Sequence, residues 1–136
     1  MAMSRTETQI EWSSSDSTSV SSGSAATSDA FTLETDCIAL AIQCKADNAG
    51  TPASGDTLDV YILWTCGDPD GASTDEYDST DHGMFVCQLD TDQDDPAIRT
   101  VDLPVSAKGG KVYVESNAAS NSITASAALY QLKSGS

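Results

Sequence analysis

Basic residues are scarce in this chain: 6 lysines and arginines stand against 21 aspartates and glutamates among 136 residues, for a formal net charge of −15. Such a surface repels phosphate backbones and anionic lipids, so we expect neither nucleic acid nor a membrane as a partner. No apolar run approaches the ~20 residues that span a bilayer, and no signal-peptide pattern opens the chain. This composition suits high ionic strength, where salt screens self-repulsion; a saline source and a plain solubility surface both remain open.

Recognisable catalytic patterns are also missing. The sequence contains no G-x-S-x-G, G-x-G-x-x-G or P-loop pattern, and its single histidine, His82, follows Asp81 in an acidic loop. A lone histidine beside a carboxylate is a proton-transfer group without a recognisable nucleophile. Carboxylate pairs at glycosidase spacing arise by chance among so many acids and carry little weight. We therefore predict a protein that is not an enzyme and that has no cofactor, with calcium as the one candidate.

Four cysteines are present, and none forms a C-x-x-C pair. With one histidine available, they do not indicate a zinc site. Strand alternation places Cys44, Cys66 and Cys87 among predicted core residues and Cys37 on an opposite face. We expect reduced, buried thiols, with one cross-strand disulfide as the alternative.

What the chain does contain is a series of short runs rich in alternating apolar residues, separated by Gly, Pro, Asp and Asn. No helical period of useful length competes with them. The runs are Asp36–Ala46, Thr57–Cys66, Met84–Leu89, Ala97–Leu103, Lys111–Asn117 and Ile123–Leu132, with Thr6–Trp12 and Ala30–Thr35 as weaker additions. We predict an all-β fold, an antiparallel β-sandwich of jelly-roll or Greek-key type with about eight strands; an immunoglobulin-like order is the alternative.

Alternation within these runs also assigns faces. Ile38 and Leu40 are predicted to point into the core together, and Phe85 and Cys87 are predicted to share one face. The run Thr57–Cys66 is apolar on both faces, which is typical of a strand that is central in its sheet or covered by a partner.

The first 28 residues differ from the rest, because a serine-rich stretch there cannot bury much apolar area. We expect residues 1–28 to form a flexible arm, or an edge strand that pairs with a neighbouring subunit, and residues 29–136 to form the sandwich domain. Ile10, Trp12 and Val20 are the residues expected to anchor this arm to a partner.

Further contact residues are predicted on half-apolar outer strand faces, at Tyr61, Leu63 and Tyr130. Exposed aromatic rings also suit sugar binding, for which Tyr61, Tyr77 and Tyr113 are candidates, although packing in the core or at its boundary is the commoner role of such residues.

One acidic loop has the spacing of a cation site. Asp90, Asp92 and Asp94 alternate as at the start of a calcium loop, and hard oxygen ligands suit Ca²⁺. The EF-hand pattern nevertheless fails, because Asp95 stands where glycine is required and Val101 where glutamate is required. Asp90, Asp92 and Asp94 are therefore a calcium candidate, with solvated turn carboxylates as the alternative.

Several stretches together resemble small virion structural proteins of tailed bacteriophages, over about residues 30–132. They are Lys45–Asp56, Val60–Trp64, Gly67–Gly71, Asp95–Arg99, Lys108–Val114 and Ser122–Ala127. The resemblance implies a jelly-roll head decoration or cement protein, dimeric or trimeric, that binds the major capsid protein or other virion proteins. It implies a location in the virion after synthesis in the host cytoplasm. A neck, tail or fibre-base adaptor and a carbohydrate-binding module are the alternatives.

Overall fold

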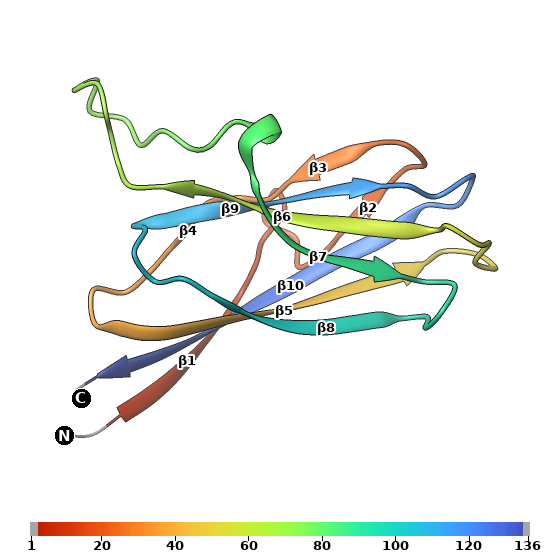
Figure 1. The fold of residues 1–136 in the computed structure, drawn as a ribbon, viewed down its shortest axis with the longest axis horizontal. Coiled ribbons are helices and arrows are strands. Elements are labelled where there is room, and N and C mark those ends of the chain that lie inside the picture. The colour runs from red at the N-terminus through yellow and green to blue at the C-terminus, as the bar shows by residue number, and fades with distance from the viewer. Residues whose placement is uncertain (1–2, 135–136) are drawn as a thin grey trace.

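The computed structural model describes residues 3–134, and they form two antiparallel β-sheets stacked face to face (Figure 1). Sheet 1 contains β1 (Met3–Gln9), β2 (Thr18–Val20), β5 (Cys37–Asn48), β8 (Ala97–Leu103) and β10 (Ile123–Ser134). Sheet 2 contains β3 (Ala25–Thr27), β4 (Phe31–Thr32), β6 (Thr57–Thr65), β7 (Met84–Asp90) and β9 (Gly109–Ser116). A single 3₁₀ turn, η1 (Thr80–His82), interrupts the loop between β6 and β7. No helix within residues 3–134 has the length and apolar character needed to cross a membrane.

The strand order is that of a jelly roll. Sheet 1 runs β1–β10–β5–β8, and β2 also pairs with β10; sheet 2 runs β3–β9–β6–β7, and β4 also pairs with β9. The short strands β1 and β2 pair with successive parts of β10, and β3 and β4 pair with successive parts of β9. Each of these two sets fills one position in its sheet, so the ten strands occupy eight positions. In chain order these form sheets 1-8-3-6 and 2-7-4-5, which are two Greek keys. The predicted antiparallel sandwich is confirmed, and its order is jelly-roll rather than immunoglobulin-like.

Alternate residues of both sheets fill the space between them. On β10, Ile123, Ala125, Ala127 and Leu129 are all buried, as their spacing predicts. The β6 strand lies inside sheet 2 between β9 and β7, and none of its residues is exposed: six of the nine are buried and three are half-buried. Leu63 points outward from β6 and is still only 4% exposed. Gly83, where the chain returns from the long loop, lies against its side chain.

A β-bulge overturns the predicted face of Phe85. Val60 pairs with Cys87, but the next residue, Tyr61, pairs with Phe85, so β7 has one more residue than β6 at this point. Cys87 consequently points into the core while Phe85 points outward and is 56% exposed. The prediction that the two share a face was wrong, because a bulge reverses the alternation on one strand only.

Two further predicted core residues lie at the surface. On β10, Leu132 pairs with Ala39 and Lys133 with Cys37, so Ile38 is the extra residue of a second irregularity and is 45% exposed. Cys66 follows the last residue of β6, immediately before Gly67 at a positive φ of 122°, and is exposed. The alternating pattern of each run ends where its ladder ends or shifts.

The N-terminal segment belongs to both sheets. The edge strand β1 pairs with β10, and the serine-rich stretch supplies β2 to sheet 1 and β3 to sheet 2 (Figure 1). Ile10, Trp12 and Val20, predicted to anchor an arm to a partner, are buried in the core of their own chain. Serine and threonine are accommodated because most of them lie at the surface, while a few apolar side chains point inward.

Buried polar groups join three loops at one end of the sandwich. The carboxylate of Asp56 accepts hydrogen bonds from the backbone N–H groups of Ala53 (3.0 Å) and Ala119 (3.1 Å) and from the side-chain amide of Asn48 (3.3 Å). The same Asn48 amide donates to the Thr91 hydroxyl (3.1 Å), which in turn donates to the Asp56 carbonyl (2.8 Å). The two backbone donors hold the pKa of Asp56 below its ordinary value.

Candidate binding surfaces

The acidic loop predicted as a calcium site is a hydrogen-bonded turn. One oxygen of Asp90 accepts from the backbone N–H groups of Asp92 (3.0 Å) and Gln93 (3.3 Å), while Asp92 and Asp94 are exposed. Among residues 3–134, three acidic ligand atoms come within 4.8 Å of one another elsewhere, at Asp68, Asp70 and Glu76. These lie in the loop after β6, and backbone N–H groups of the same loop bind Asp68 and Asp70.

An aromatic row crosses the outer face of sheet 2. Cross-strand pairing aligns Thr27 on β3, Tyr113 on β9, Tyr61 on β6 and Phe85 on β7. The ring centroids of Tyr61 and Phe85 are 5.5 Å apart with the planes at 69°, and those of Tyr61 and Tyr113 are 6.0 Å apart at 46°. The Tyr61 and Phe85 rings pack edge to face, and the Tyr113 ring is tilted against that of Tyr61. They form one continuous apolar strip across three neighbouring strands, which we call the aromatic row (Tyr61, Phe85 and Tyr113).

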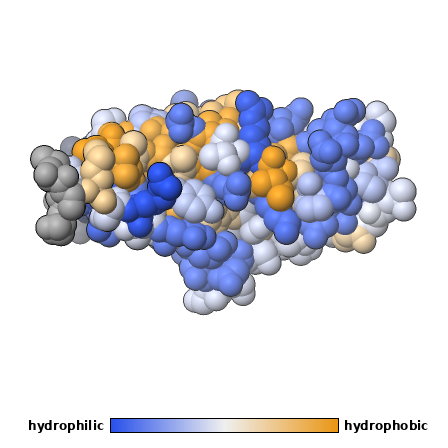
Figure 2. Space-filling model, turned by 90° about the horizontal axis from the view of Figure 1, so that it is seen from below, coloured by the Kyte–Doolittle hydropathy of each residue, from blue (hydrophilic) through white to orange (hydrophobic). Residues whose placement is uncertain are grey.

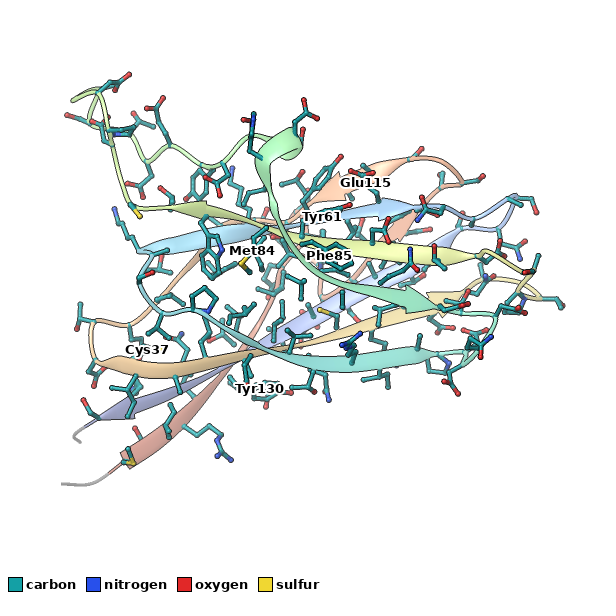
Figure 3. All side chains as sticks on the ribbon, viewed as in Figure 1. Cys37, Tyr61, Met84, Phe85, Glu115 and Tyr130 are labelled. Carbon is teal, nitrogen blue, oxygen red and sulfur yellow. The ribbon has the colours of Figure 1, made fainter. Side chains whose placement is uncertain are left out.

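Carboxylates and amides border this row. On the same face, the next cross-strand pair along β6 and β9 is Asp59 with Glu115, and Gln88 on β7 pairs with Asp59 from the other side. Burial, followed by the negative charges of Asp59 and Glu115, raises the pKa of Tyr61; burial and Glu115 do the same for the pKa of Tyr113. Figure 3 shows Tyr61, Phe85 and Glu115 together on one side of the molecule and Tyr130 on the other.

A polar groove of about 460 Å³ begins where the aromatic row ends. Its walls include Tyr113, Glu115 and Asn117 together with the turn before β3, at Gly23 and Ser24. The outer face of sheet 2 therefore offers ring surface, carboxylate and amide side by side.

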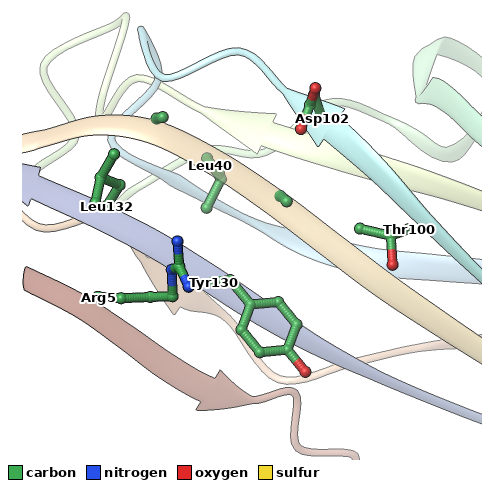
Figure 4. A pocket seen from close by; sticks show the side chains of 8 residues that line it. Arg5, Leu40, Thr100, Asp102, Tyr130 and Leu132 are labelled. Carbon is green, nitrogen blue, oxygen red and sulfur yellow. The ribbon is translucent and has the colours of Figure 1, made fainter.

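The outer face of sheet 1 carries a second, more apolar groove of about 350 Å³ (Figure 4). Arg5 and Tyr130 lie on one side of it, Asp102 and Thr100 on the other, and Ala39, Leu40, Ala41 and Leu132 complete the lining. In the view from below, hydrophobic residues gather near the chain ends, and hydrophilic residues predominate over the rest of the face (Figure 2).

The four cysteines are free thiols and do not form a disulfide. Cys44 on β5 and Cys87 on β7 are buried in the core, one from each sheet. The contact of Cys44 with the Cys87 thiol, followed by the burial of Cys44, raises the pKa of Cys44. The Cys44 thiol is therefore held in its neutral form. Cys37 is half-buried against the same core.

The predicted contact residues are thus dispersed. Tyr61 lies in the aromatic row, Tyr130 lines the groove of sheet 1, and Leu63 is covered by the loop that returns to β7. Tyr77, the third sugar-platform candidate, packs in that loop beneath the Lys111 ammonium, which is 4.5 Å from its ring centroid. Phe85 was not among the predicted contact residues, because its outward orientation depends on the bulge opposite Tyr61.

Comparison with known proteins identifies no family for this chain. No family model matches the chain, and no curated protein matches it in sequence. Among solved structures, the C-terminal CBM6 of LamC, a marine laminarinase from Zobellia galactanivorans, aligns over 96% of this chain and 99% of its own, at 9% identity and a TM-score of 0.45. A chain of the acid-stable capsid of Helicobacter pylori bacteriophage KHP30 aligns over 96% and 88%, at 15% identity and a TM-score of 0.38.

A third solved structure, the GH115 4-O-methyl-α-glucuronidase BtGH115A, aligns over 96% of this chain at 16% identity and a TM-score of 0.41. The chain spans only 16% of that enzyme's length. At such identities and TM-scores, these likenesses carry no argument about function.

Proposed function

We propose that this chain is a non-enzymatic virion structural protein, of the head decoration or cement type, which attaches to a protein partner through the outer face of sheet 2. The observation behind the proposal is the aromatic row, because it is continuous over three neighbouring strands and ends in Phe85, which is more than half exposed. Aromatic side chains held on a rigid sheet favour a protein interface, where they contribute large contact areas at low entropic cost.

The rest of the surface suits a protein displayed in many copies. A net charge of −15 keeps like-charged particles apart, while the aromatic row supplies local adhesion. We propose the major capsid protein or another virion protein as the partner, with two or three copies of this chain associating at each attachment point. A neck, tail or fibre-base adaptor would use the same surface in far fewer copies.

The copy number of this chain in particles purified from the source that encodes it tests the proposal. A stained gel that shows on the order of hundreds of copies supports head decoration, and roughly a dozen indicates a neck or tail position. Particles without this chain would contradict a virion role.

A matched pair of variants tests the surface itself. Phe85→Ala should reduce the number of copies retained on particles, while Ile98→Ala on β8 should not, although Ile98 is equally exposed at 56%. Equal retention of both variants would contradict attachment through the aromatic row.

Carbohydrate binding is the second candidate function, favoured by the polar groove next to Tyr113. Ring surface, the Glu115 carboxylate and the Asn117 amide there are the groups that bind the faces and hydroxyls of sugar rings. A glycan array probed with the wild-type chain and with Tyr113→Ala tests it. Binding of a neutral glycan that Tyr113→Ala abolishes would support this candidate over protein attachment.

A further inference from the structure

Two acidic residues are paired across neighbouring strands beside the aromatic row, and neither forms an ion pair with another described residue. Asp59 on β6 and Glu115 on β9 are directly paired across the strands, both half-buried on the outer face of sheet 2. Like charges directly opposite on neighbouring strands destabilise a sheet. The next pair on the same face is Tyr61 with Tyr113, so the two charges border two rings.

The contacts of Asp59 that fix its position come from neutral side chains. Its two carboxylate oxygens accept hydrogen bonds from the side-chain amides of Gln88 (2.8 Å) and Asn117 (3.0 Å), which are neutral donors. Among the described residues, the ion pairs are Lys108–Asp75 and Lys133–Glu34, both elsewhere. A lysine on β9, Lys111, has its ammonium group over the ring of Tyr77.

The geometry points to a site for the guanidinium group of an arginine-bearing segment of the partner protein, with Asp59 and Glu115 accepting its N–H groups and the rings of Tyr61 and Tyr113 against its planar face. The inference rests on the proposed attachment through this face. A guanidinium is permanently charged, donates to carboxylates in a planar fork and stacks on aromatic rings, so it matches both halves of the site.

Other cations fit this site less well. Calcium takes six to eight oxygen ligands, whereas this site offers two carboxylates beside aromatic rings. A lysine ammonium would relieve the repulsion but lacks the planar fork, so it should bind more weakly than arginine. A neutral glycan would leave the paired charges uncompensated.

A blocked hexapeptide containing two arginines is a direct probe, with the same peptide containing citrulline, a neutral isostere, as its control. Binding to the full chain can be followed by NMR through the ring resonances of Tyr61, Phe85 and Tyr113. We expect the arginine peptide to shift these resonances and the citrulline peptide to bind at least about tenfold more weakly. Equal binding of both peptides would overturn the guanidinium site.

Two glutamate variants separate this site from attraction to the net charge. Glu115→Gln should weaken the arginine peptide about tenfold. It should also raise the unfolding midpoint by about 1–3 °C, because the cross-strand repulsion is removed. Glu7→Gln makes the same change on the exposed face of β1 in sheet 1 and should do neither. Equal weakening by both variants would mean unspecific binding and overturn the site.

Particle attachment distinguishes this inference from the function on which it rests. If Phe85→Ala releases the chain from particles and Glu115→Gln does not, attachment through the aromatic row stands and the arginine site is wrong. If neither variant changes attachment, both the arginine site and the proposed attachment through the aromatic row are wrong.

Discussion

The N-terminal segment should contribute to stability as a core element, and Ile10 tests this directly. Ile10 is 1% exposed, packs in the core between the sheets, and its backbone N–H donates to the Ala127 carbonyl on β10 at 2.9 Å. Truncating a buried isoleucine to alanine costs about 2–5 kcal/mol in lost burial and residual cavity. For a domain of this size each kcal/mol shifts the melting temperature by about 3 °C, so Ile10→Ala should lower it by roughly 6–15 °C.

Ile98→Ala is the matched control, because the same atoms are removed from a side chain that is 56% exposed on β8. Its cost should stay within about 0.5 kcal/mol. Thermal unfolding of both variants, followed by far-UV circular dichroism, measures the difference in melting temperature. If Ile10→Ala unfolds at the wild-type midpoint, the segment lies outside the cooperative fold. The hypothesis of a free arm that is ordered only by a partner would then replace the structural role derived from its burial.

The remaining predictions concern other parts of the chain. Asp56 has a lowered pKa, so its contribution is present above the unfolded-state pKa of about 3.9 and is lost as the pH falls through the lower folded value; Asp56→Asn should therefore reduce the loss of stability measured between pH 5 and pH 2. Gly109→Ala should lower the melting temperature severely, because a Cβ there would meet the Phe31 carbonyl oxygen. A thiol reagent should label Cys66 rapidly in the native protein and Cys44 only on unfolding, with four thiols counted in denaturant. Molar salt should raise the unfolding midpoint, because few ion pairs offset the net charge of −15.

Sequence alternation predicted the fold well wherever a ladder runs without interruption. On β10 the residues from Ile123 to Leu132 pair with β5 in constant register, and the inward side chains are those that the spacing selects. The strand β6 is central in sheet 2, which is one of the two positions that its apolar faces predicted, since residues that are apolar on both faces need cover on both. These inferences require knowledge of one strand only.

The residues that were misplaced depend on two strands at once. Phe85 turns outward because β7 has one more residue than β6 at the bulge between them. Ile38 turns outward because β5 has one more residue than β10 at their register shift. A single strand's sequence contains no signal for either register shift. The serine-rich segment was predicted to bury little apolar area because its average composition is polar. A single buried residue, Val20, is nevertheless enough to place β2 in the core.

The candidate site was only partly predictable for the same reason. Tyr61 and Tyr113 each stand out in their own strand, but their alignment with Phe85, and that of Asp59 with Glu115, follows from the pairing of β6 with β7 and β9. A like-charge pair is a local cost that the fold does not require, since either position would accept a neutral residue facing solvent. The Asp59 and Glu115 charges thus oppose the stability of the free chain beside its most exposed aromatic ring. This conflict favours a contact made after folding, in which a cation on a partner neutralises the repulsion.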